Sequence, residues 1–135
     1  MITLIICTYN REKYIRPLLE SIVKNDYPAT DYEIVLVDNN CTDNTRGVCE
    51  EFSALHPEVT LRYVVESEQG LSAARNKGIK EAKGDIIIYV DDDALVDTDY
   101  IRQYAKHFAA HPETMAAGGP IEPLYETEEP SWMSP

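Results

Sequence analysis

The chain has 135 residues, of which 44% are hydrophobic, and this is enough for one buried core but too little for two comfortable domains. Its 24 acidic residues outnumber 12 Lys and Arg, and the resulting net charge of −12 argues against nucleic acid as a partner. No apolar run approaches the roughly 18 residues of a membrane span, and no signal-type segment opens the chain, so we expect a cytoplasmic protein without a transmembrane segment.

The first predicted elements alternate between strand and helix. Residues 2–8 form a β-branched run typical of a strand buried on both faces. Apolar residues recur at helical spacing over 12–24, where Pro17 lies early enough to be tolerated. A second strand is predicted over 32–37 and ends at Asp38, after which the sequence NNCTDN offers turn chemistry and a cap for a further helix.

The rest of the chain continues the alternation. After the helix that follows Asp38, the predicted elements are strand 61–65, helix 71–82, strand 85–90, helix 98–110 and a short strand over 116–119. Gly84 suits a C-terminal cap for the third helix because it lacks a Cβ atom. Strands alternating with helices predict an α/β fold, with a Rossmann-like, doubly wound, mainly parallel sheet and helices on both faces.

The last segment has a different composition. Residues 120–135 contain four Pro, four Glu and the single Trp, without an apolar period, which predicts an extended or mobile tail. We therefore expect one domain over 1–119 and a tail over 120–135.

Polar side chains follow three of the predicted strands. The sequence TYNR follows the first strand, Asp38 ends the second, and three consecutive acidic residues, 91–93, follow the fourth. Ligands of open parallel sheets bind beyond the carboxyl ends of the strands, so these side chains should share one edge. If the chain stays extended, Asp91 and Asp93 point the same way and Asp92 points elsewhere.

The acidic cluster favours a metal ion. Two carboxylates about 4 Å apart repel by roughly 1 kcal/mol in water, and by more in a cleft of lower dielectric. A divalent cation removes that penalty, and ligands that are all oxygen suit Mn²⁺ or Mg²⁺. The alternative is a solvated loop or helix cap, which is how we interpret Asp97 and Asp99.

Arg75 lies near the amino end of its predicted helix, where the helix dipole disfavours a cation. A nearby anion would explain its position, and the backbone N–H groups there could also receive phosphate oxygens. An ion pair with one of the many acidic residues is the alternative. The motifs of dinucleotide-binding proteins, P-loop enzymes, serine hydrolases and zinc proteases are all missing from the chain.

Taken in order, four segments resemble the family 2 glycosyltransferases of the GT-A fold: ITLIICTYNR, EIVLVDNNCTDNT, EQGLSAARNKGIKEAKGDIIIYVDDDALV and GGPI. The resemblance implies an inverting glycosyltransferase that moves a sugar from a nucleotide diphosphate, with a UDP-sugar favoured, to an acceptor hydroxyl. It also implies a part in cell-surface polysaccharide biosynthesis, at the inner face of the membrane in a longer protein.

The resemblance also implies a role for each polar residue. Its DXD motif falls on residues 91–93, where Asp91 and Asp93 would hold Mn²⁺ or Mg²⁺ and Asp92 could reach the ribose or a metal-bound water. The other implied donor contacts are to the nucleoside from Thr8, Tyr9 and Arg11, to the base N–H from Asp38, and to the base or diphosphate from Arg75.

The family's general base lies in an acidic motif further along the chain. We therefore assign no catalytic residue, expect the base beyond Pro135, and expect the tail to begin a missing acceptor-side region. The sequence leaves the oligomeric state open.

Two other functions compete with this interpretation. In a phosphotransferase of haloacid-dehalogenase type, Asp91 would attack phosphorus and Asp93 would act as the acid, although Leu95 stands where Thr or Val is usual and that fold normally opens with this strand. The second alternative is a non-catalytic module that binds a nucleotide sugar without transferring it.

Overall fold

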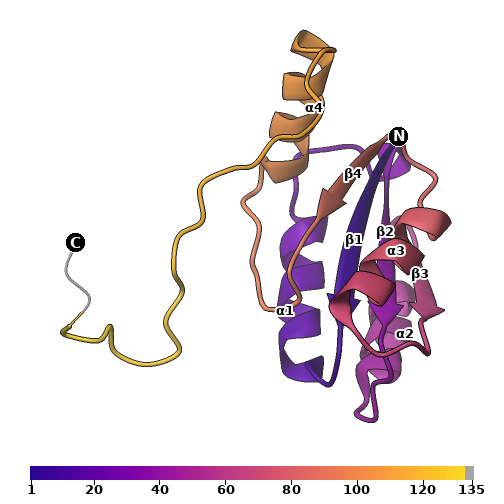
Figure 1. Ribbon diagram of the computed structural model, residues 1–135, viewed down its shortest axis with the longest axis vertical. Helices are drawn as coiled ribbons and strands as arrows, with labels where there is room; N and C mark the ends of the chain where they lie inside the picture. Colours follow the sequence, from indigo (N-terminus) through magenta and orange to yellow (C-terminus); the bar gives the residue numbers. More distant parts are fainter. Residues whose placement is uncertain (133–135) are drawn as a thin grey trace.

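In the computed structural model, which describes residues 1–132, strands and helices alternate as the apolar periods predict. Figure 1 shows the elements, which are β1 (Ile2–Thr8), α1 (Glu12–Val23), β2 (Tyr32–Asp38), α2 (Thr45–Leu55), β3 (Thr60–Val65), α3 (Leu71–Glu81), β4 (Ile86–Tyr89) and α4 (Tyr100–Ala110). A short 3-10 turn, η1 (Ala29–Asp31), precedes β2. Helix α1 continues through Pro17 without a break.

The four strands form one parallel sheet in the order β3-β2-β1-β4. The chain first moves outward from β1 to β2 and β3, and then returns to the other side of β1 to form β4. The strand order therefore reverses between β1 and β4, which is the point where open α/β sheets bind their ligands.

Helices cover both faces of the sheet, because the side chains of the central strands are apolar on both sides. The larger core joins Leu4 and Leu36 to the buried faces of α1 and α2, with Phe52 as its largest fully buried side chain. On the opposite face, Ile5 and Val35 pack with Ala74 of α3. The predicted doubly wound α/β architecture is confirmed.

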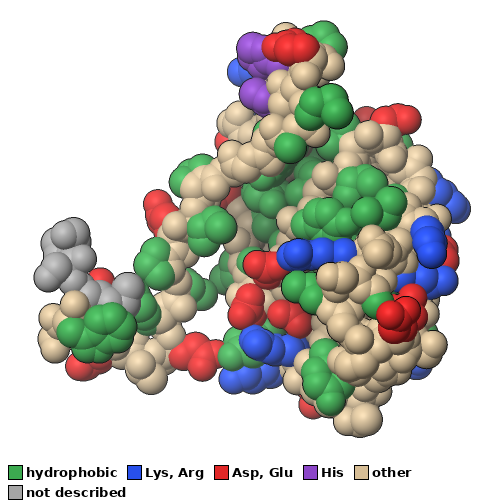
Figure 2. Space-filling model, in the orientation of Figure 1, with side chains coloured by type: hydrophobic (Ala, Val, Ile, Leu, Met, Phe, Trp, Pro, Cys, Tyr) green, Lys and Arg blue, Asp and Glu red, His purple; other side chains and the backbone are tan. Residues whose placement is uncertain are grey.

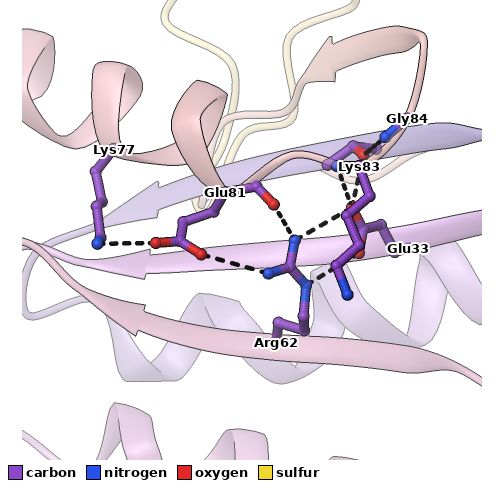
Figure 3. A network of polar contacts seen from close by, with 7 residues as sticks. Glu33, Arg62, Lys77, Glu81, Lys83 and Gly84 are labelled. Atoms are coloured by element: carbon purple, nitrogen blue, oxygen red, sulfur yellow. Dashed lines mark hydrogen bonds and ion pairs between the residues drawn. The ribbon is translucent and has the colours of Figure 1, made fainter.

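A polar network stabilises the amino ends of the strands, opposite the edge where the acidic residues lie (Figure 3). Glu33, only 2% exposed, accepts hydrogen bonds from the Thr3 hydroxyl at 2.8 Å and the Lys83 backbone N–H at 2.8 Å. Arg62 pairs with Glu33 at 3.0 Å and also donates to the backbone carbonyl of Glu81. Burial raises the pKa of Glu33, but the bonds from Arg62, Lys83 and Thr3 outweigh burial and leave that pKa below its usual value.

The interpretation of Gly84 as a helix cap is wrong. Helix α3 ends at Glu81, and its C-cap is Ala82 in an extended conformation. Gly84 lies instead against the start of β1, where an added Cβ atom would lie 2.6 Å from the Thr3 backbone nitrogen and 2.7 Å from the Met1 carbonyl oxygen. The glycine is required by close backbone packing rather than by turn geometry.

The predicted strand over 116–119 is also wrong. These residues have no regular structure, and β4 pairs only with β1 within the described chain. Two glycines followed by Pro120 explain this, because glycine loses most entropy on ordering and proline cannot donate to a sheet.

Residues 120–132 likewise contain no helix or strand, while 133–135 lie outside the described residues. Glu126 contacts α1 through the Tyr14 hydroxyl and, at 3.5 Å, the Lys13 ammonium. The division at residue 119 stays a prediction. No helix within residues 1–132 is long and apolar enough to cross a bilayer.

Candidate functional site

A groove of about 450 Å³ lies at the carboxyl end of the sheet, where the strand order reverses. Its lining residues come from four segments of the chain and are Cys7, Thr8, Tyr9, Arg11, Asn39, Gln69, Gly70, Leu71, Ala74, Asp91, Asp92 and Asp93. All of the predicted site residues except Asp38 and Arg75 are in this set. Figure 2 shows acidic side chains gathered beside basic ones on this face of the molecule.

A larger hollow of about 520 Å³ lies between β4, α4 and residues 115–121. It is lined mainly by apolar and aromatic side chains, including Ile87, Tyr104 and Phe108, and by no charged group. Of these two hollows, only the first is lined by charged side chains.

The three consecutive aspartates lie in a turn rather than in an extended strand. Strand β4 ends at Tyr89, and the Ala94 N–H donates to the Asp91 carbonyl oxygen at 3.1 Å. We expected Asp91 and Asp93 to point the same way only if the chain stayed extended. Because the chain turns here, that condition is not met. Asp91 and Asp93 are exposed, whereas Asp92 is half-buried.

The electrostatics of Asp92 reflect this crowding. Burial raises the pKa of Asp92, and the charges of Asp93 and Asp91 act in the same direction. The Thr8 hydroxyl and the Arg11 guanidinium act in the opposite direction but do not cancel the rise. Burial is thus the main reason why the pKa of Asp92 is raised, and the neighbouring carboxylates add to it.

Arg11 neutralises one member of the acidic turn. Its Nη1 atom lies 3.1 Å from Asp93 Oδ2, and both side chains are about half exposed, at 48% and 50%. The guanidinium also lies over the ring of Tyr14, 5.6 Å from its centre. Arg11 follows β1 and Asp93 follows β4, so adjacent parallel strands bring the pair together.

The residues present fit a metal ion only in part. Within residues 1–132, no three His, Cys, Asp or Glu side chains are arranged around one metal position. The turn does offer the exposed carboxylates of Asp91 and Asp93, which are oxygen ligands of the kind that Mg²⁺ and Mn²⁺ prefer. These ions usually keep several water or phosphate ligands, so two protein carboxylates are compatible with such a site.

Asp38 lies beneath the groove rather than in its lining. It is 8% exposed, and its two oxygens accept hydrogen bonds from the Cys41 N–H at 2.6 Å and from the Tyr63 hydroxyl at 2.5 Å. Burial raises its pKa, but these bonds outweigh burial and leave the pKa below its usual value. Asp38 is therefore an ionised carboxylate that already holds the turn after β2.

Thr8 has an unusual environment for a buried residue. It is 3% exposed, and its Oγ1 atom has no hydrogen-bond partner of good geometry within the described chain. The hydroxyl nevertheless lies near enough to Asp92 to lower the pKa of that carboxyl. Buried hydroxyls are normally satisfied, so this hydroxyl, in the lining of a groove, is available to a polar group of a ligand.

Arg75 lies beside the groove. It is exposed on α3, and its guanidinium lies 5.4 Å from the centre of the Tyr89 ring. It forms no ion pair with any residue among 1–132, so the alternative of an ion pair is wrong. Burial raises the pKa of the Cys7 thiol in the groove to about 11, and the charge of Arg75 opposes this rise.

Two parts of the groove could not be predicted from the sequence. Asn39 is buried in its lining, and the loop of residues 66–70 forms part of its wall. The sequence NNCTDN predicted turn and cap chemistry, and Asp43 does accept bonds from the N–H and hydroxyl of Thr45. The burial of Asn39 was not predictable, because it depends on where a loop some 30 positions later folds.

Comparison with known proteins relates the chain to one family of enzymes. A sequence profile of glycosyl transferase family 2 matches residues 3–135. The chain is 34% identical to the glycosyltransferase GlyA of Streptococcus pneumoniae over 87% of its own length and 16% of that protein.

Two solved structures share the fold. The crystal structure of Staphylococcus aureus TarS 1-349 in complex with UDP superposes with a TM-score of 0.75 and 31% identity, over 82% of this chain and 32% of that one. The mannosyltransferase PcManGT of Pyrobaculum calidifontis, in complex with GDP-Man and Mn²⁺, gives 0.67 and 36%, over 70% of this chain and 28% of that one. The chain thus spans less than half the length of each of these proteins.

Proposed function

Because this chain belongs to glycosyl transferase family 2 and has the GT-A fold of solved glycosyltransferases, we propose that it binds a nucleotide-diphosphate sugar in the groove between β1 and β4 and takes part in sugar transfer to an acceptor hydroxyl. One observation carries the proposal. The groove at the point of strand reversal combines an acidic turn, two arginines in or beside it, and the buried hydroxyl of Thr8, which has no hydrogen bond of good geometry to any residue among 1–132.

The acidic turn is the proposed metal and diphosphate end of the groove. Asp91 and Asp93 would hold Mn²⁺ or Mg²⁺, and the ion would supply positive charge against the leaving diphosphate. Asp92, which is half-buried and next to Thr8, would reach the ribose or a metal-bound water. The presence of Mn²⁺ with GDP-Man in the PcManGT structure supports this assignment.

The loop after β1 is the proposed nucleoside end. Tyr9 is 53% exposed and offers a ring face for a base, while the unpaired Thr8 hydroxyl can bond a polar group of the nucleoside. Asp38 is ionised and retains free lone pairs, so its carboxylate can accept a further bond from a base N–H. Arg75 forms no ion pair with a described residue and would face the negative charge of the donor.

We favour a uridine nucleotide, because the TarS structure contains UDP. TarS of Staphylococcus aureus is a poly(ribitol-phosphate) beta-N-acetylglucosaminyltransferase, which supports a polymer with free hydroxyl groups as the acceptor here. Inverting transfer needs a base that removes the proton of the acceptor hydroxyl on the opposite face of the sugar. We assign that role to no residue of this chain and place the base beyond Pro135.

The test is a binding panel on the full chain. UDP, GDP, ADP and CDP are titrated by calorimetry with Mn²⁺ or Mg²⁺, and the panel is repeated on Asp93→Ala. We expect one nucleotide, UDP, to bind with a requirement for metal that the variant loses. Asp97→Ala removes an exposed carboxylate from the same stretch and serves as the control. Equal binding of all four nucleotides, or wild-type binding by Asp93→Ala, contradicts the proposal.

The phosphotransferase alternative gains no support. The strand before the acidic turn is the fourth along the chain and lies at the edge of the sheet, whereas that enzyme class normally opens with it. The relatives described above are glycosyltransferases. A turnover assay with the nucleotide sugar distinguishes transfer from binding alone.

A further inference from the structure

The loop between β3 and α3, residues 66–70, forms part of the groove wall without any apolar side chain of its own. Its sequence is ESEQG, and Gln69 and Gly70 line the same groove as the acidic turn. Such a loop cannot be anchored by core packing, so its position depends on hydrogen bonds.

The side chain of Asn39 provides most of those bonds. Its Nδ2 atom donates to the carbonyl oxygens of Glu66, at 2.9 Å, and Glu68, at 2.7 Å. Its Oδ1 atom accepts from the Gly70 N–H at 2.9 Å and from Gln69 Nε2 at 3.4 Å. A primary amide has two donor hydrogens and two acceptor lone pairs, so Asn39 uses its whole capacity on one loop.

Asn39 is itself held firmly at the end of the sheet. It is 4% exposed, and its backbone N–H donates to the Thr8 carbonyl oxygen at 3.0 Å. The neighbouring Asn40 adds a hydrogen bond to the same loop, because its Nδ2 atom donates to the Ser67 carbonyl oxygen at 3.1 Å. The ends of β1 and β2 are thereby connected to the loop.

The position of the loop decides what the groove presents to a ligand. Gly70 is the N-cap of α3 and has φ of 139° and ψ of 144°, a conformation that other residues rarely adopt. The first N–H groups of a helix have no partner within the helix and attract anions. Because Gly70 and Leu71 line the groove, moving the loop moves these donors relative to the acidic turn.

We infer that Asn39 is a positioning residue for the nucleotide diphosphate. Its amide holds residues 66–70 and the start of α3 in the arrangement that the ligand meets, and it does so without touching the ligand. The inference rests on the proposed function, since it concerns the same groove. If the bound arrangement of the loop falls to a tenth of the population, apparent affinity falls about tenfold.

Asn25 supplies a matched control. It is 9% exposed, donates to the Asp97 carbonyl oxygen at 3.1 Å and accepts from the Ile101 N–H at 2.9 Å. Like Asn39, it is a buried amide that connects distant backbone segments. It follows the C-terminus of α1, whereas the groove lies at the N-terminus of that helix.

The experiment compares Asn39→Ala with Asn25→Ala in the full chain. Amide hydrogen exchange is measured on the peptide that covers residues 66–71, thermal stability is recorded, and UDP and GDP are titrated in the presence of Mn²⁺. We expect both variants to lose thermal stability. Only Asn39→Ala should exchange faster at Gly70 and bind the nucleotide about tenfold more weakly.

If Asn39→Ala does not fold, Asn39→Asp is used, because it has the same shape and keeps an acceptor for the Gly70 N–H while losing both donors. Unchanged affinity in a folded Asn39 variant overturns the inference, as does an equal loss of affinity in Asn25→Ala. Unchanged exchange at Gly70 overturns it as well. Failure of the wild-type chain to bind either nucleotide overturns the proposed function instead, and the exchange result then still decides whether Asn39 orders the loop.

Discussion

At the scale of single residues, the pair of Arg11 and Asp93 has the clearest chemical consequence. Arg11 was predicted to line the nucleoside pocket and Asp93 to hold the metal ion, yet in this structure they bond to each other at 3.1 Å. Under the proposed function, a metal ion on Asp93 would compete with the guanidinium for this carboxylate. Arg11 would then oppose metal binding before the donor binds, and would be available to the nucleotide afterwards.

Replacing Arg11 should separate these two effects. Exposed ion pairs contribute about 0.2–1 kcal/mol, so Arg11→Gln should bind Mn²⁺ alone up to about fivefold more tightly than the wild type. The same variant should bind UDP with Mn²⁺ more weakly. Electron paramagnetic resonance of free Mn²⁺ measures the first effect and calorimetry the second.

Lys13→Gln is the control for this experiment. It removes the same charge from the same helix end, but Lys13 pairs with Glu126 and not with Asp93. If Lys13→Gln tightens Mn²⁺ binding as much as Arg11→Gln does, the gain comes from net charge and the competition is absent.

Residue types alone did not indicate how the acidic turn is arranged. The sequence placed three carboxylates after a strand, and the structure places them in the groove. Their relative directions follow from the turn closed by the Ala94 N–H, and the Arg11 pair follows from the alignment of β1 with β4. Neither depends on the local sequence period.

At the scale of elements, the segment that connects α3 to β4 passes so close to β1 that position 84 has no room for a side chain. The Gly84 N–H donates to the Thr3 hydroxyl at 2.9 Å, and the space for a Cβ atom is taken by backbone atoms of β1 and the residue before it. Backbone cannot move aside as the end of a side chain can.

Gly84→Ala should therefore destabilise the fold by about 3 kcal/mol, at the upper end of the range for overpacking. Urea unfolding followed by circular dichroism gives the free energy of unfolding. Gly118→Ala is the matched control, because nothing lies within 4 Å of its added Cβ atom, and it should change stability little. Equal stability of the two variants would show that the connection has room to relax.

At the scale of the whole molecule, the polar groups at the two ends of the sheet are arranged differently. The amino ends are joined by the network around Glu33, whose carboxylate accepts bonds from Thr3, Arg62 and Lys83 (Figure 3). The carboxyl ends hold the unpaired Thr8 hydroxyl and the crowded aspartates. The amino ends are thus joined by an ion-pair network, whereas the carboxyl ends also present polar groups to the groove.

The network makes stability depend on pH. The pKa of Glu33 is lower in the folded chain than its ordinary value of 4.5, so the unfolded chain binds the proton more readily. The contribution of Glu33 is complete above about pH 4.5 and disappears as the pH falls through the folded pKa.

Glu33→Gln should remove part of this dependence. We expect the variant to be less stable at pH 7 by about 1–3 kcal/mol, because Arg62 loses a buried charged partner. The difference from wild type should shrink as the pH approaches 3. Urea titrations across this pH range measure it, with the exposed Glu128→Gln as the control. A difference that stays constant with pH would rule out the charge of Glu33 as its cause.

The sequence by itself determined the alternation of strands and helices, the burial of the central strands and the edge at which polar residues gather. These features follow from local apolar periods and from the rule that the carboxyl ends of parallel strands meet at one edge. It also carried the family resemblance, through motifs that are contiguous in the chain.

Only the tertiary structure decided that Arg11 pairs with Asp93, that Asn39 holds residues 66–70, and that Gly84 lies against β1. Each of these depends on a contact between residues far apart in the chain. Such contacts exist only after strands, helices and loops have been placed relative to one another, and no local period in the sequence encodes that placement.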